Sequence, residues 1–147
     1  MSVLPGQEAA EIQAFVSLLR AHASVTRELS GELVGEHGLT INDYEVMWRL
    51  WRAPDRMLRR VDLAQQVLLT PSGITRLLDG LQRAGYVEKA ACDSDARVVY
   101  ARLTDAGARR LQKASASHFA SIRERFCGCF TEAELCELAG LLDRLHP

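Results

Sequence analysis

A short segment in the middle of the chain places hydroxyl, arginine and glycine residues at spacings that suit contact with a polyanion. Ser72 and Thr75 can hydrogen-bond through their hydroxyl groups, and Arg76 can donate two parallel hydrogen bonds to one guanine. Gly73 lets the backbone approach a ligand closely, and Pro71 is favoured at the first position of a helix, whose N-terminus attracts phosphate. The segment therefore predicts the start of a nucleic-acid-binding helix.

A second candidate is an arginine at the tip of a predicted β-hairpin. Residues 86–90 and 98–103 show the alternation that is typical of β-strands, and the polar segment between them ends in Arg97. An arginine at a hairpin tip suits the narrow, negatively charged minor groove of DNA. Taken alone, Arg76 could equally be a solvated helix residue, and Asp95 with Arg97 could be an ion pair that stabilises the turn.

Helices predicted on both sides of these residues must hold them in place. Capping boxes are predicted at Thr40, with Asp43, and at Thr131, with Glu134, and Gly38 and Gly85 are expected to end two of the helices. Apolar residues at helical spacing predict helices over residues 8–36, 40–53, 61–67 and 71–84, followed by two that begin at Thr104 and Thr131. The predicted order is four helices, a β-hairpin and two more helices.

This order contains a winged helix-turn-helix, in which two short helices joined by a tight turn are followed by a β-hairpin. In such a motif the second helix enters the major groove of DNA, and the hairpin tip reaches the backbone or the minor groove. In this chain the second helix of the motif is the one predicted over residues 71–84. The residues expected to bury one of its faces are Ile74, Leu77, Leu78 and Leu81. Arg60, at the start of the motif's first helix (residues 61–67), would face phosphate or solvent. We therefore predict a mainly α fold with a small β-hairpin wing (α+β), in which residues 39–104 form the DNA-binding domain.

The charge distribution agrees with a DNA-binding middle and ends that do not bind DNA. Residues 56–110 carry ten basic and six acidic side chains, whereas residues 1–55 carry four basic and eight acidic ones. The leucines of the last predicted helix have no partner within so short a chain, so residues 1–38 and 105–147 are expected to form a helical dimerisation region. A homodimer would set its recognition helices about 34–36 Å apart, which predicts a pseudo-palindromic operator in double-stranded DNA.

Residues from about Leu39 to Leu111 resemble the multiple-antibiotic-resistance regulator (MarR) family of bacterial transcription factors. The most specific match is Asp95-Ala96-Arg97, then five residues, then Leu103-Thr104, which follows the family's wing pattern D-x-R-x5-L-T without a gap. Further matches, in the family's order, are Leu63-Ala64, Thr70-Pro71-Ser72, Thr75-Arg76-Leu77-Leu78, Leu81 and Gly85-Tyr86-Val87-Glu88.

The resemblance implies a dimeric DNA-binding regulator, expected to be a repressor, whose first helix and last two helices pair across a two-fold axis. By analogy with the family, Arg97 enters the minor groove and Asp95 orients it. Family members often bind small aromatic or phenolic compounds between the dimer helices and the winged domain, so we expect such an effector to modulate DNA affinity. The candidate pocket residues, each of which could instead be core or interface packing, are His22, Thr26, Tyr44, Trp48 and Trp51.

Two alternatives remain open. Cys92 beside the wing, with Cys127 and Cys129 in the predicted dimerisation region, could make the protein a thiol-redox regulator, although a buried cysteine more commonly acts as a small apolar residue. A winged helix could also serve as a protein-interaction adaptor, which would have no salt-sensitive affinity for DNA.

Composition excludes other functional classes. The chain has 147 residues, of which 48% are hydrophobic and 25% charged, as expected for one globular domain or protomer. No apolar run is long enough to cross a membrane and the N-terminus lacks the features of a signal peptide, so we expect a cytoplasmic protein with reduced cysteines and no membrane partner. The HExxH, P-loop, GxSxG and GxGxxG motifs are absent and the four histidines are scattered, so we expect no enzyme activity, no metal and no cofactor.

Overall fold

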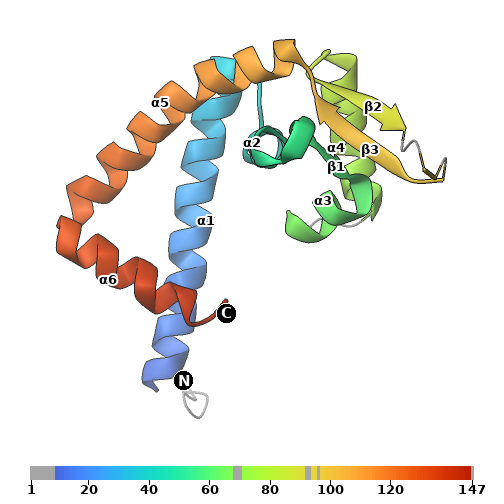
Figure 1. The fold of residues 1–147 in the computed structure, drawn as a ribbon. Helices are drawn as coiled ribbons and strands as arrows, with labels where there is room; N and C mark the ends of the chain where they lie inside the picture. The colour runs from blue at the N-terminus through green and yellow to red at the C-terminus, as the bar shows by residue number, and fades with distance from the viewer. Residues whose placement is uncertain (1–8, 68–70, 92–93, 96, 147) are drawn as a thin grey trace, which may run out of the picture.

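The computed structural model of the chain describes residues 9–67, 71–91, 94–95 and 97–146 (Figure 1). Helices α1 (Ala10–His37), α5 (Asp105–Cys129) and α6 (Glu132–Asp143) form a helical arm, and the elements between α1 and α5 form a lobe at the end where α5 begins. Figure 1 shows that α1 begins and α6 ends far from the lobe. None of the helices in the described ranges is long and apolar enough to cross a membrane.

The helix ends lie where local capping signals predict them. α1 ends before Gly38, which adopts a φ of +67° in the left-handed region that glycine tolerates. α2 (Ile41–Arg52) begins after Thr40, whose hydroxyl accepts a hydrogen bond from the Asp43 N–H at 3.0 Å while the Asp43 carboxylate accepts one from the Thr40 N–H at 2.9 Å. The same kind of capping box forms at Thr131, before α6. These predictions are confirmed, because each box satisfies backbone donors that the helix itself cannot.

Helices α3 (Arg60–Gln66) and α4 (Pro71–Arg83) form the helix-turn-helix of the lobe. The predicted apolar face of α4 packs on the core through its buried or partly buried residues Ile74, Leu77, Leu78 and Leu81. Gly85 adopts a φ of +81° after α4, which turns the chain into the sheet. The predicted N-cap Thr70 lies outside the described residues.

The predicted β-hairpin belongs to a three-stranded antiparallel sheet. Strands β2 (Val87–Ala91) and β3 (Val99–Leu103) form the expected hairpin, and β1 (Met57–Arg59) adds a strand in the order β1-β3-β2. β1 pairs along its length with residues 100–102 of β3. The predicted β-hairpin wing is confirmed, and β1 is an additional strand that the sequence did not reveal, because three residues are too few to show the alternation that identifies a strand.

A strained turn (Pro54–Arg56) leads from α2 into β1. Asp55 and Arg56 adopt φ values of 54° and 55°, which are unfavourable for residues with a Cβ atom. The Arg56 guanidinium lies 4.6 Å from the centre of the Trp51 ring and 3.4 Å from the Asp105 carboxylate. These contacts tie the strained turn to α2 and to the start of α5.

The core lies where α1, α2 and the start of α5 meet the helix-turn-helix and the sheet. Its largest fully buried side chains are Leu33, Leu39, Met47, Leu50, Leu63 and Leu111. The hydroxyl of Thr104 accepts a hydrogen bond from the Gly107 N–H at 3.0 Å and donates one to the Gly85 carbonyl at 2.6 Å. A Cβ atom at Gly107 would overlap the carbonyl oxygen of Tyr86 and lie 2.7 Å from the Leu103 side chain. Glycine at this position therefore lets α5 pack directly on the sheet.

Candidate nucleic-acid interface

The polar residues predicted on α4 share the side of this helix that faces solvent. Ser72, Thr75 and Arg76 are all exposed, and their spacing of three and four residues places them on one face. Gly73 is half-buried, and Pro71 is the first residue of α4, as predicted. The start of α4 therefore offers two hydroxyl groups and a guanidinium to a partner, while its opposite face is held in the core.

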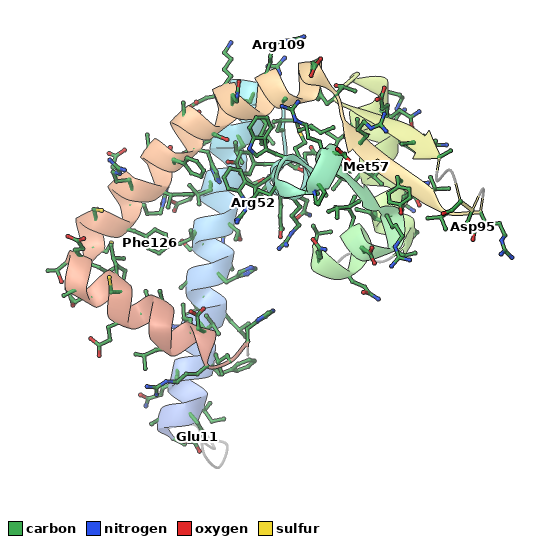
Figure 2. The ribbon with its side chains drawn as sticks, in the orientation of Figure 1. Glu11, Arg52, Met57, Asp95, Arg109 and Phe126 are labelled. Atoms are coloured by element: carbon green, nitrogen blue, oxygen red, sulfur yellow. The ribbon has the colours of Figure 1, made fainter. Side chains whose placement is uncertain are left out.

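The tip of the hairpin presents one arginine and the carboxylate that positions it. The Arg97 side chain is 92% exposed, and its Nε donates to Oδ1 of Asp95 at 3.3 Å. The same oxygen accepts the backbone N–H of Arg97 at 3.0 Å, so Asp95 both closes the turn and holds the base of the arginine side chain. Figure 2 shows Asp95 at the tip of the hairpin, on the side of the lobe away from the helical arm.

Two arginines lie next to each other at the start of α3. Arg59 precedes the helix and donates to both carboxylate oxygens of Asp62, at 2.9 and 3.1 Å. These hydrogen bonds raise the pKa of Arg59 above its ordinary value. Arg60, the predicted phosphate contact, is the first residue of the helix and is half-buried. Because Asp62 already engages Arg59, Arg60 is the better candidate for phosphate.

A group of polar side chains, which we call the junction, joins α5 to α1 and α2. It consists of His37, Tyr44, Ser115, Ser117 and His118. The Tyr44 and Ser115 hydroxyls lie 2.8 Å apart, Nε2 of His37 lies 2.6 Å from the Ser117 hydroxyl, and the His118 ring lies 4.5 Å from that of Tyr44. Burial raises the pKa of Tyr44 and lowers the pKa of His118. Sequence reasoning missed the junction because its two hydrogen bonds join residues 71 and 80 positions apart.

Charged side chains extend the contact between α1 and α5 beyond the junction. Arg125 of α5 forms ion pairs with Glu28 and Glu32 of α1. Among the described residues, Oε2 of Glu32, Nε of Arg125 and Nδ1 of His37 are buried without a hydrogen-bond partner. The two long helices of the arm, α1 and α5, are therefore joined by charged as well as apolar side chains.

A cleft of about 440 Å³ lies beside α2. Trp48, Arg49 and Arg52 of α2 line one part of it, and Leu58 and Gln66 line another part. The Arg52 guanidinium lies 6.0 Å from the centre of the Trp48 ring, and Arg49 is paired with a neighbouring glutamate. Its volume and its mixture of an aromatic ring with charged groups suit a small organic ligand.

The five residues proposed for an effector pocket are divided among different environments. Trp48 lines the 440 Å³ cleft, whereas Tyr44 belongs to the junction and Trp51 packs against Arg56. On α1, His22 is exposed, and the Thr26 hydroxyl donates to the His22 carbonyl within the helix. The structure therefore does not gather these five side chains around the cleft beside α2.

Two of the three cysteines proposed for redox sensing lie near the end of α5. Cys127 and Cys129 are exposed and free, as is Cys136 on α6. Cys92 lies outside the described residues. Within the described part of the chain, no group of three or more histidine, cysteine, aspartate or glutamate side chains is arranged to hold a metal ion.

Sequence comparisons identify relatives of the chain. The MarR family model matches residues 39–99, which cover most of the lobe. The HTH-type transcriptional repressor YetL of Bacillus subtilis is 30% identical over 115 residues, which span 78% of this chain and 68% of YetL. The HTH-type transcriptional regulator MhqR of Bacillus subtilis is 26% identical over 113 residues, which span 77% of this chain and 76% of MhqR.

Solved structures share the whole architecture. AbsC, a MarR family transcriptional regulator from Streptomyces coelicolor, matches with a TM-score of 0.85 at 28% identity, over 99% of this chain and 95% of AbsC. Sco3205, a MarR family regulator from the same organism in complex with DNA, matches with a TM-score of 0.86 at 23% identity, over 99% of this chain and 89% of Sco3205. A mutant MarR from Escherichia coli complexed with operator DNA matches with a TM-score of 0.82 at 21% identity, over 99% of this chain and all of that one. The last two likenesses concern the fold alone.

The lobe, its wing and the relatives agree with one another. The three-stranded wing and the helix-turn-helix occupy the residues that the family model matches, and the relatives are transcriptional regulators rather than enzymes. The chain belongs to the MarR family and is a DNA-binding transcriptional regulator.

Proposed function

We propose that the protein is a homodimeric repressor that binds a pseudo-palindromic operator and whose DNA affinity is modulated by a small aromatic effector. The observation that carries this proposal is the exposed polar face at the start of α4, on the same lobe as an almost fully exposed Arg97. A helix and a hairpin tip that present such groups together can engage a major groove and the adjoining minor groove.

Each DNA-facing residue has a distinct role in this proposal. Ser72, Thr75 and Arg76 contact base edges and phosphates in the major groove, with Arg76 as the residue able to select guanine. Arg97 enters the minor groove, and Asp95 orients it through the 3.3 Å contact. Pro71 and Gly73 shape the helix start, and Arg60 contacts phosphate; these contacts position the lobe without selecting a sequence.

Exposed apolar side chains on the helical arm support a homodimer. The most exposed large ones include Phe15 (58%), Phe119 (49%) and Leu145 (73%), from α1, from α5 and from the segment just after α6. A stable monomer rarely exposes so many large apolar residues on adjoining elements, whereas a second copy of the chain would bury them. We therefore assign residues 1–38 and 105–147 to dimerisation and residues 39–104 to DNA binding.

Two features support repression and its modulation by an effector. YetL, the relative at 30% identity, is a transcriptional repressor by name. The cleft beside α2 combines the Trp48 ring with arginines and reaches Gln66, the last residue of α3. A ligand there would touch the helix that packs on the arm and the helix that precedes α4, so it could favour one lobe position over another.

A fluorescence-anisotropy titration with DNA from upstream of the protein's own coding region tests the proposal. The wild-type protein should bind tightly, selectively and less strongly as salt increases. Arg97→Ala should lower affinity about fivefold to a hundredfold and reduce the salt dependence by about one phosphate equivalent, with little change in stability. Arg76→Ala should also relax base preference.

Arg109→Ala is the matched control, because it removes an exposed arginine of α5 that lies outside the residues proposed to contact DNA. It should bind like the wild type. Equal affinity for Arg97→Ala would contradict the role of the wing, and unchanged selectivity for Arg76→Ala would remove it from the base-contacting residues. A protein that binds a protein partner tightly, but shows no salt-sensitive binding to this DNA or to duplexes selected from random DNA, would instead be an adaptor.

A further inference from the structure

The junction holds α5 from two sides. Ser115 and Ser117 are two residues apart, so their side chains project about 200° apart around the helix. Ser115 contacts Tyr44 near the start of α2, and Ser117 contacts His37, the last residue of α1. Rotation of α5 about its own axis would therefore disturb both hydrogen bonds.

The Ser117 hydroxyl is the hydrogen-bond partner of the His37 ring. It lies 2.6 Å from Nε2 of His37 and 3.2 Å from the Ala114 carbonyl. The His37 side chain is only 7% exposed, and its Nδ1 has no hydrogen-bond partner among the described residues. The nearest carboxylate, that of Glu36, lies 3.6 Å from Nε2. Ser117 is therefore the hydrogen-bonding group that orients the ring.

The residues beneath the junction do not supply a comparable directional contact. Leu33 of α1, together with Leu111 and Ala114 of α5, is buried and apolar. Apolar contacts stabilise the packing without a preferred direction, whereas a hydrogen bond weakens steeply when its distance or angle changes. The Tyr44–Ser115 hydrogen bond is thus a directional contact between the lobe and the arm, beside the contacts of Arg56 with Asp105 and of Arg110 with Tyr86. The His37–Ser117 hydrogen bond fixes the rotation of α5 against α1, next to the point where the chain leaves α1 for the lobe.

We propose that Ser115 and Ser117, acting through Tyr44 and His37, are positioning residues that set the lobe's orientation and hence the half-site spacing that the dimer accepts. The inference rests on the proposed homodimer. None of the four residues lies on the exposed face of α4 or at the hairpin tip. One inserted base pair moves the second half-site by about 3.4 Å and rotates it by about 35°, so a change in lobe orientation alters the preferred spacing.

The test compares operators that differ only in half-site spacing. The operator is selected from random duplexes with the wild-type protein, and anisotropy then measures affinity for it and for versions with one base pair inserted or removed at the centre. Ser117→Ala and Tyr44→Phe each remove one hydrogen bond and should reduce the preference for the selected spacing roughly threefold to tenfold, the effect expected of one such bond. Ser117→Thr keeps the hydroxyl and should restore the wild-type preference.

Gln112→Ala is the matched control, because it removes an exposed polar side chain from the same helix, and it should keep the wild-type ratio. Thermal unfolding at equal protein concentration verifies that every variant folds. If the Ser117→Ala and Tyr44→Phe proteins fold but bind all three duplexes more weakly by the same factor, the positioning role is overturned. The proposed function is then left intact. A wild-type protein that binds all three duplexes equally would overturn the two-half-site operator, and this inference with it.

Discussion

Replacing Gly107 by alanine should destabilise the protein, although alanine is usually the better residue in a helix. Gly107 is buried in the first turn of α5, where the helix packs on the chain segment around Tyr86. An added Cβ atom would overlap the Tyr86 carbonyl oxygen and lie 2.7 Å from Cδ1 of Leu103. The same carbonyl accepts the Thr104 N–H at 3.0 Å, so moving it away also strains the hydrogen bond that precedes α5.

The expected magnitude follows from three opposing contributions. Overpacking a close contact costs about 1–3 kcal/mol, and a weakened hydrogen bond costs about 0.5–1.5 kcal/mol. The gain in helix propensity from glycine to alanine offsets about 0.5–1 kcal/mol of this. We therefore expect Gly107→Ala to lower the free energy of unfolding by about 0.5–4 kcal/mol.

Gly80→Ala provides a control of opposite sign within the same chain. Gly80 lies inside α4, and an added Cβ atom there would meet no heavy atom within 4 Å. This variant should raise the free energy of unfolding by about 0.5–1 kcal/mol. Urea denaturation at one fixed protein concentration measures both variants, because the stability of a dimer depends on concentration. A Gly107→Ala protein as stable as the wild type would refute the argument that close packing requires glycine here.

Other parts of the structure support three further predictions. Burial lowers the pKa of His118 below its ordinary 6.5, so near that pH the unfolded chain binds more protons than the folded one. Thermal stability should therefore fall as the pH drops through 6.5. An equally steep fall in the His118→Gln variant would contradict this. Asp55→Gly should raise the free energy of unfolding by about 0.5 kcal/mol, because glycine accepts a φ of 54° without steric cost. Urea denaturation measures the change, and a loss of stability would show that the Asp55 side chain is needed. In a Trp51→Phe protein, Trp48 is the sole tryptophan, and an aromatic effector bound in the cleft should quench its fluorescence. An effector that changes DNA affinity without this quenching would bind elsewhere.

The sequence alone determined the features that depend on neighbouring residues. The capping boxes at Thr40 and Thr131 form as predicted because their hydrogen bonds span three residues. The apolar spacing of α4 leaves Ser72, Thr75 and Arg76 on the exposed face, since one helical period relates both sets of residues. The family resemblance over the wing is confirmed by the match to residues 39–99.

Tertiary structure decided the features that depend on contacts between distant segments. β1 is a strand because residues 57–59 find a partner in β3, more than 40 positions away, and not because of any alternation of their own. The junction likewise exists only where α5 returns to α1 and α2, and it takes Tyr44 into a hydrogen bond with Ser115. Local patterns could not reveal these pairings, because the free energy of a strand pair or of a buried hydrogen bond depends on which segments the fold brings together.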